Sequence, residues 1–220
     1  MHSVTRCPLT YWSSIGVPML KSMAVASAAD AVRAAQHLGL PAVLKGCAPD
    51  ILHKSEHELV RLRLANGEQI SVAFVDLLAK LNHVSHSPRK EIVLQPQAKL
   101  GIELIVGVRN YPGFGSLLVV GLGGMFVELL NESSERLGPV DEATAKAMLD
   151  ETRAGQILRG FRGQGPYDID AAAATIAAIS RFGAATIDSV SVLEINPLII
   201  HVAGEGATGV DLLLEPVSAG

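Results

Sequence analysis

The apolar residues of this 220-residue chain are divided among many short segments, none of which approaches the ~18 consecutive apolar residues of a membrane span. They nevertheless make up 49 % of the chain, whereas charged residues make up only 18 %. Such a composition can bury a sizeable core and argues against disorder. We therefore expect a globular protein, built as one large domain or as two small domains packed together.

Charge and cysteine content exclude several classes of function. A net charge of −4 and an aromatic content of 4 % argue against a nucleic-acid partner. Two cysteines, Cys7 and Cys47, are too few for a disulfide framework or a four-cysteine zinc site. Residues 1–15 lack the basic start and apolar core of a secretory signal. We expect a cytoplasmic protein that binds neither nucleic acid nor membrane.

Helical periodicity is clearest in two segments. Ser27 and Asp30 have the spacing of a capping box, and apolar residues at helical spacing follow until Gly39, which predicts a helix over residues 27–39. Asp168 can cap a long helix whose inner face begins with Ile169 and Ala172. Two further helices are expected, one with Phe74, Leu77, Leu78 and Leu81 on one face and one over residues 141–149.

Short apolar runs bounded by turn residues predict strands. The expected strands cover residues 41–45, 59–64, 91–95, 102–108 and 116–121. A turn is expected at Asn66-Gly67, and a C-terminal hairpin of residues 190–202 and 207–214 turns at residues 204–206. The prediction is an α+β chain with mixed or antiparallel sheets.

Three polar residues gather on this hairpin. If it turns about residues 204–205, position 196 lies opposite position 213, so that Asn196 and Asp211 are diagonal neighbours on one face. Glu194 shares that face. Two carboxylates and an amide oxygen are hard ligands suited to a magnesium ion that carries nucleotide phosphates. The alternative is an ordinary polar solvent face.

Lys45 and the Gly-rich segment 121–124 are two further candidates for ligand binding. Lys45 ends an apolar strand, where its ammonium could reach a phosphate or could simply extend into solvent. The glycines of residues 121–124 serve tight turns and close ligand approach equally well. A Walker-type phosphate loop does not occur in the sequence.

Residues 53–57, His-Lys-Ser-Glu-His, match the H-x-x-E-H pattern of some zinc proteases. That chemistry needs both histidines on one face of a helix, yet Pro49-Asp50 precedes the motif and a strand-like run follows it. His53 could instead act as a nucleophile toward phosphorus. Zinc hydrolysis is the less favoured of the two hypotheses.

The order of these segments resembles the ATP-grasp domain of NDP-forming acyl-CoA synthetases, the β-subunit type of ADP-forming acetate–CoA ligase, which is related to the succinyl-CoA synthetase β subunit. The resemblance covers about residues 15–214. Its matching blocks are residues 15–18, 38–45, 49–55, 101–108, 114–115, 121–124, 127–129, 136–139, 160–163 and 194–198.

The resemblance implies an ATP-grasp fold, in which two α+β lobes hold ATP or ADP between them, so that residues 1–220 form a single domain with two subdomains. It also implies a reversible phosphoryl relay from a CoA-binding partner, through a histidine, to ADP, and hence a hetero-oligomer or a piece of a larger chain. The site residues it implies are Lys45 and Glu103 for the nucleotide, Gly123 and Gly124 near the phosphoryl group, Asn196 and Asp211 for Mg²⁺, Glu194 facing the phosphohistidine, and His53 as a second phosphoryl carrier.

The chain departs from the family pattern beside His53. Glu56-His57-Glu58-Leu59-Val60 stands where the family has Asp-Val-Gly-Gly-Val, so a glycine pair is lost. Gln95-Pro96-Gln97 stands where the family has Gln-Glu-Met. A second hypothesis follows, namely a non-catalytic nucleotide-binding module of the regulatory kind fused to lysine acetyltransferases.

Overall fold

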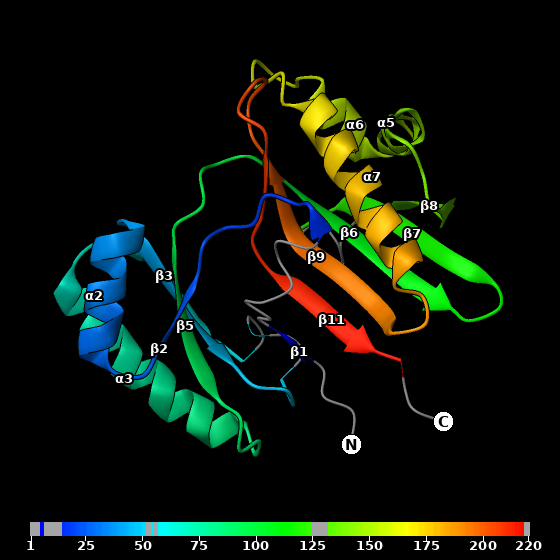
Figure 1. Cartoon of the computed structure of the whole chain (residues 1–220). Helices are drawn as coiled ribbons and strands as arrows, with labels where there is room; N and C mark the ends of the chain where they lie inside the picture. The colour runs from blue at the N-terminus through cyan, green and yellow to red at the C-terminus, as the bar shows by residue number, and fades with distance from the viewer. Residues whose placement is uncertain (1–4, 7–14, 52–53, 55–56, 125–131, 218–220) are drawn as a thin grey trace. The chain divides into compact units, whose positions relative to one another are not determined.

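A computed structural model of the chain describes residues 5–6, 15–51, 54, 57–124 and 132–217. They belong to two compact units, one made of Met1–Met19 and Lys99–Gly220 and the other of Leu20–Ala98 (Figure 1). Each unit has its own sheet and its own core. The pairings between named strands are antiparallel, which confirms the α+β class with antiparallel sheets. That residues 1–220 form a single domain stays a prediction.

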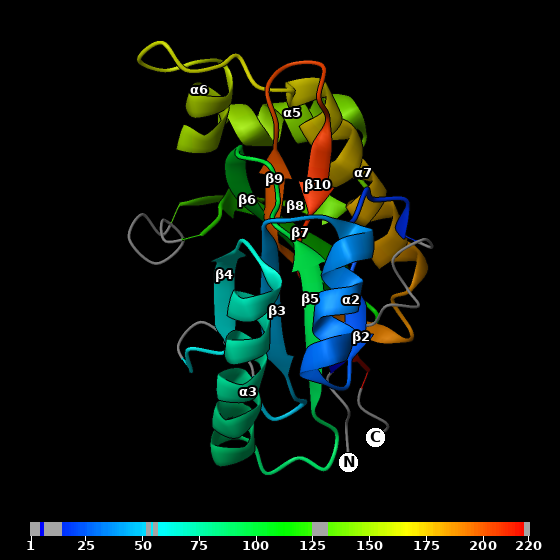
Figure 2. The same ribbon diagram turned by 90° about the vertical axis from the view of Figure 1, so that its left-hand side faces the viewer.

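The smaller unit is a four-stranded sheet, in the order β2-β5-β3-β4, with two helices on one face (Figure 2). Its elements are β2 (Met23–Val25), α2 (Ala28–Leu38), β3 (Ala42–Cys47), β4 (Val60–Leu64), α3 (Gly67–Val84) and β5 (Glu91–Pro96). The helix predicted over residues 27–39 is confirmed. The Ser27 hydroxyl accepts a hydrogen bond from the Asp30 N–H at 3.1 Å, and Gly39 follows the last helical residue.

The turn predicted at Asn66-Gly67 is wrong, because Asn66 caps α3 instead. Its side-chain oxygen accepts a hydrogen bond from the Gln69 N–H at 2.9 Å. Asparagine favours turns and helix N-caps for the same reason, since its short amide bonds nearby backbone groups. The predicted inner face of this helix is mostly confirmed, but Leu78 is partly exposed whereas Phe74 is buried.

The larger unit has a sheet in the order β1-β11-β9-β6-β7-β8, with β10 also paired to β9. Its strands are β1 (Thr5–Arg6), β6 (Ile102–Tyr111), β7 (Gly115–Leu122), β8 (Ser133–Gly138), β9 (Val190–Ile200), β10 (Ala207–Gly209) and β11 (Leu212–Pro216). Its helices are α5 (Glu142–Asp150), α6 (Arg153–Leu158) and α7 (Ile169–Ala185). They lie on one face of the sheet (Figure 1).

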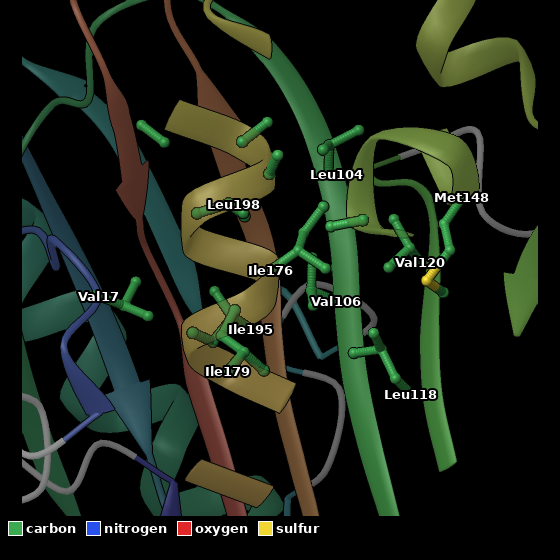
Figure 3. Close-up of a cluster of buried hydrophobic side chains, with 14 of the residues drawn as sticks. Val17, Leu104, Val106, Leu118, Val120, Met148, Ile176, Ile179, Ile195 and Leu198 are labelled. Carbon is green, nitrogen blue, oxygen red and sulfur yellow. The ribbon is translucent and has the colours of Figure 1, made fainter. Parts of the chain in front are cut away.

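The core of the larger unit lies between α7 and the sheet. Ile176 and Ile179 of α7 point toward β6 and β9 and are fully buried there, together with Leu104 and Leu198 (Figure 3). The helix approaches closely, because a Cβ atom on Gly183 would lie 2.5 Å from Val108 Cγ1. The face of the sheet that carries Leu104 and Leu198 is thereby covered by α7.

Asp168 joins the start of α7 to the β9–β10 hairpin. Its carboxylate accepts hydrogen bonds from the N–H groups of Ala171, Gly204 and Gly206, each at 3.0 Å. The bond from Ala171 has the largest effect on the pKa of Asp168, which these bonds together hold below its ordinary value despite partial burial. The predicted cap is thus confirmed, and it also fixes the hairpin turn.

Within the described ranges, every helix falls short of the length and hydrophobicity that a membrane span requires.

Candidate functional site

The candidate residues of the larger unit lie on the sheet face opposite α7. On β6, Leu104, Val106 and Val108 belong to the core under the helices. Because side chains alternate along a strand, Glu103 points to the other face. The same alternation on β9 buries Leu193 and Ile195 in the core. Glu194, like Glu103, therefore faces away from the core.

Glu103 and Gly123 are 20 residues apart in the sequence, but they meet at one end of the sheet. The Gly123 N–H donates a hydrogen bond to the Glu103 carbonyl oxygen at 2.7 Å. A Cβ atom on Gly123 would lie 2.7 Å from the carbonyl carbon of Leu104, so only glycine allows this approach. Gly124 has a left-handed backbone, with φ +63°, and a Cβ there would overlap Glu103 Oε2. Gly123 therefore allows the close approach to the backbone of β6, and Gly124 makes room for the Glu103 carboxylate.

Asn196 and Asp211 lie directly opposite each other on neighbouring segments. Ile195 pairs with Leu212 and Glu194 pairs with Leu213, and the Asn196 N–H donates to the Asp211 carbonyl oxygen at 3.1 Å. Directly opposed residues in an antiparallel pair direct their side chains to the same face. The two oxygen-bearing side chains are thus brought together more closely than the sequence predicted.

The predicted register, with position 196 opposite position 213, is wrong by two residues. The hairpin reverses at Ala203-Gly204, where the Glu205 N–H donates to the Val202 carbonyl oxygen at 2.9 Å. Gly204 supplies the positive φ, +85°, that this turn requires. The reversal lies one residue earlier than expected, and each residue of shift in a turn moves the pairing by two.

Strand β9 has a bulge at Asn196, one of the candidate metal ligands. Leu104 pairs with Leu198 but Val106 pairs with Ile195, so Asn196 and Pro197 together oppose one residue of β6. A bulge re-aims side chains and also accommodates proline, which has no N–H to donate. Glu194, two positions before Asn196, lies about 7 Å along the same strand on the same side.

Lys45 belongs to the smaller unit, where it pairs with Val93 and Val60. Its neighbour Leu44 is in the core beneath the helices, so Lys45 points to the other face of that sheet. The predicted strand end is wrong, because β3 continues to Cys47. Lys45 is only 5 % exposed, which excludes a solvent-extended surface lysine. Burial at this level requires compensation of the ammonium charge.

His53 lies outside the described residues, but the segment before it is firmly anchored. The Asp50 carboxylate accepts hydrogen bonds from the Ser85 hydroxyl at 2.7 Å and from the backbone N–H groups of His86 and Ser87 at 2.8 and 3.1 Å. Burial acts to raise the pKa of Asp50, but these hydrogen bonds outweigh it and lower the pKa. From the sequence, Asp50 stood out only as a residue that precedes the H-x-x-E-H motif and as part of the block 49–55.

The described residues of the H-x-x-E-H segment do not form the helix that the zinc-protease interpretation needs. The described parts of the H-x-x-E-H segment, Lys54 and His57, lie in turns, and the Leu59 N–H bonds the Lys54 carbonyl oxygen at 2.8 Å. Two of its motif residues, His53 and Glu56, fall outside the described ranges. Among the residues that the structure does describe, no three His, Cys, Asp or Glu side chains are grouped as metal ligands.

Comparisons with known proteins agree on one family. The family model described as "ATP-grasp domain" matches residues 10–215. The chain is 32 % identical over 199 residues to the β subunit of ADP-forming acetate–CoA ligase II of Pyrococcus furiosus, covering 89 % of this chain and 84 % of that subunit. It is 30 % identical to the ADP-forming 4-hydroxybutyrate–CoA ligase of Nitrosopumilus maritimus, covering 90 % of this chain but only 28 % of the relative.

Solved structures give the same result. The fold matches an acetyl-coenzyme A synthetase of Ca. Korarchaeum cryptofilum in complex with coenzyme A and Ca-AMPCP, with a TM-score of 0.88, 30 % identity and coverage of 98 % and 93 % of the two chains. A second structure of that enzyme (TM-score 0.77, 30 % identity, 93 % and 87 % coverage) holds Mg-AMPPCP with its phosphohistidine segment pointing towards the nucleotide binding site. From its fold and from these matches, the chain belongs to the ATP-grasp domain family, in the branch of the ADP-forming acyl-CoA synthetases.

Proposed function

We propose that this chain is the nucleotide-binding, phosphoryl-transferring part of an ADP-forming acyl-CoA synthetase. The observation that carries the proposal is the direct opposition of Asn196 and Asp211, with Glu194 on the same face. An amide oxygen and a carboxylate at one point suit Mg²⁺ bound to a nucleotide, because Mg²⁺ usually takes one or two protein oxygens and completes its shell with phosphate and water.

The other candidate residues take roles that fit their chemistry. The Lys45 ammonium binds a phosphate as a point charge. The Glu103 carboxylate, held against Gly124, accepts hydrogen bonds from the ribose hydroxyls. Gly123 and Gly124 keep side chains away from the transferred phosphoryl group. Mg²⁺, when bound, neutralises phosphate charge during transfer.

The proposed reaction runs in both directions. On a CoA-binding, acyl-handling partner, acyl-CoA and inorganic phosphate give acyl phosphate and free CoA. The phosphoryl group passes from the acyl phosphate to a histidine nitrogen and releases the carboxylate. It then passes from the histidine to the terminal phosphate of ADP and forms ATP. Glu194 faces the phosphohistidine, and His53 serves as the carrier on this chain.

Calorimetric titration with ATP and ADP, with and without Mg²⁺, tests the nucleotide site. The wild-type chain is expected to bind Mg-ATP more tightly than metal-free ATP. Asp211→Ala should lose that difference, because triphosphate charge is left uncompensated. Asp188→Ala removes an exposed carboxylate of the same unit and should retain it. An Asp211→Ala variant that binds Mg-ATP as tightly as the wild type would overturn the metal assignment.

Phosphohistidine mapping tests the relay. The chain is incubated with the CoA-binding partner, an acyl-CoA and labelled phosphate. Label on His53 that disappears in His53→Ala is expected. Label that survives in His53→Ala but disappears in His57→Ala would show that the carrier is wrongly assigned. Nucleotide binding without any label would identify a non-catalytic module.

A further inference from the structure

The connection between α6 and α7 forms a tight, fully exposed hairpin. The Phe161 N–H donates to the Gln164 carbonyl oxygen at 3.0 Å, and the Gln164 N–H donates back to the Phe161 carbonyl oxygen at 3.1 Å. Arg162 and Gly163 form its tip with φ values of +51° and +81°. Positive φ at both central residues is the pattern of a type I′ turn. We call residues 160–166 the tip loop; every residue in it is exposed. Figure 2 shows its backbone as the yellow loop that follows α6.

The base of the tip loop is firmly attached to the larger unit. The Gly160 N–H donates to the Ile157 carbonyl oxygen at 3.0 Å, and the Tyr167 N–H donates to the Leu158 carbonyl oxygen at 2.8 Å. The Pro166 carbonyl oxygen accepts from the Ala203 N–H at 3.0 Å. The loop is therefore a preformed projection whose shape is set before any partner binds.

Phe161 and Arg162, at the tip, are unfavourable for the stability of the free chain. Phe161 is 59 % exposed, and the Arg162 guanidinium carbon lies 5.3 Å from the centre of its ring. Type I′ turns favour Asn, Asp or Gly at the position of Arg162, because a left-handed backbone strains other residues. A turn that served only to join two helices would be more stable with glycine there. Backbone strain of this kind is retained where a side chain is needed.

The charge of Arg162 is also uncompensated within the described part of the chain. Nearby Arg159 binds Asp150 through two bonds of 2.7 Å, and Arg153 lies 3.5 Å from Glu132. Within the described residues, the contact that the Arg162 guanidinium makes is with the Phe161 ring. A phosphate site would gather several donors, whereas one free guanidinium beside one aromatic ring matches the residues that dominate protein–protein interfaces.

We propose that the tip loop docks this chain onto the CoA-binding polypeptide of the synthetase. Phe161 enters an apolar pocket, and Arg162 pairs with a carboxylate at its edge. The inference rests on the proposed function, which requires such a partner. A rigid hairpin suits this role because little conformational entropy is lost when it binds.

The test compares Arg162→Gly and Phe161→Ala with the wild-type chain in calorimetric binding to the separately expressed CoA-binding polypeptide. Each variant should bind it about tenfold more weakly or worse. Arg162→Gly removes the backbone strain, so its melting temperature should equal or exceed that of the wild type. Phe114→Ala is the matched control, because Phe114 is 73 % exposed at the β6–β7 turn of the same unit and should not alter partner affinity.

Titration with Mg-ATP separates this inference from the proposed function. Both tip variants should bind Mg-ATP like the wild type. Partner affinities within threefold of the wild type, or no complex at all with a chain that still binds Mg-ATP, would overturn the docking role alone. A loss of Mg-ATP affinity in Arg162→Gly would instead assign the tip to the nucleotide site. Failure of the wild-type chain to bind Mg-ATP would overturn the proposed function.

Discussion

Gly124→Ala tests whether a backbone position controls the Glu103 carboxylate. The three atoms nearest to a Cβ on Gly124 all belong to Glu103: Oε2, which it would overlap, Cδ at 3.3 Å and Cβ at 3.9 Å. Among the described residues, the added methyl group therefore meets the flexible Glu103 side chain rather than backbone. We expect the fold to survive and the carboxylate to be displaced.

The magnitudes of the two effects can be separated. A non-glycine residue in the left-handed region costs about 1–2 kcal/mol of folding free energy. For a chain of this size that lowers the melting temperature by roughly 2–8 °C. A hydrogen bond to a charged group contributes about 1.5–3 kcal/mol, so losing the contacts that we propose between Glu103 and the ribose should weaken ATP binding roughly ten- to a hundredfold.

Gly113→Ala provides the control for backbone strain. Gly113 also has a left-handed backbone, with φ +81°, but a Cβ there meets nothing within 4 Å. The melting temperature of Gly113→Ala should therefore fall by about as much as that of Gly124→Ala. Its ATP affinity, measured by calorimetry, should stay at the wild-type value. In a Glu103→Ala background, Gly124→Ala should weaken ATP binding no further, because the carboxylate is already gone. Equal ATP affinities for Gly124→Ala and Gly113→Ala, or additive effects in the double variant, would refute the reasoning.

Three predictions concern stability. Gly123→Ala should unfold at markedly lower temperature than Gly124→Ala, because its methyl group meets the Leu104 backbone at 2.7 Å rather than a movable side chain. Gly183→Ala should cost about 1–3 kcal/mol in urea unfolding, since α7 must move away from the sheet; an unchanged midpoint would contradict that packing. Asp168→Asn keeps the helix cap, but its amide nitrogen cannot accept the bonds from Gly204 and Gly206, so the variant should lose about 1.5–3 kcal/mol at pH 7. Hydrogen bonds lower the pKa of Asp168 in the folded state. Its contribution to the free energy of unfolding is therefore complete above the unfolded-state pKa of about 3.9 and is lost as the pH falls through the folded-state pKa. The wild type and Asp168→Asn should accordingly have converging stabilities in urea titrations at low pH.

Local signals in the sequence predicted the long helices well. The Ser27 cap, the Gly39 stop and the Asp168 cap act on the few backbone groups next to them, so their effect can be read from neighbouring residues. The apolar strands β3, β5, β6 and β7 were also predicted close to their observed bounds, since buried strands leave continuous apolar runs.

Elements that depend on their neighbours were missed. The strand β8 reads Ser-Ser-Glu-Arg-Leu-Gly and has no apolar run to indicate it. It forms because β7 offers it an edge with which to pair, from Ser133 opposite Gly121 to Gly138 opposite Ser116. The short elements β1, β2 and α6 carry too few residues for any periodicity to appear.

For the candidate site, too, some features could be predicted from the sequence and others depended on the tertiary structure. Residue types alone determined that Asn196, Asp211 and Glu194 could serve a magnesium nucleotide, because hard oxygen ligands suit that ion. The direct opposition of Asn196 and Asp211 needed the tertiary structure, since the position of the Ala203-Gly204 turn sets the register.

The sequence by itself determined the α+β class, the principal helices and the chemistry available for binding. Only the tertiary structure brought Gly124 against the Glu103 carboxylate, and only its backbone geometry placed Arg162 in a left-handed turn. The physical reason is distance along the chain: caps and periodicity act over a few residues, whereas strand register, close backbone approach and turn geometry depend on groups that meet only once the sheet has formed.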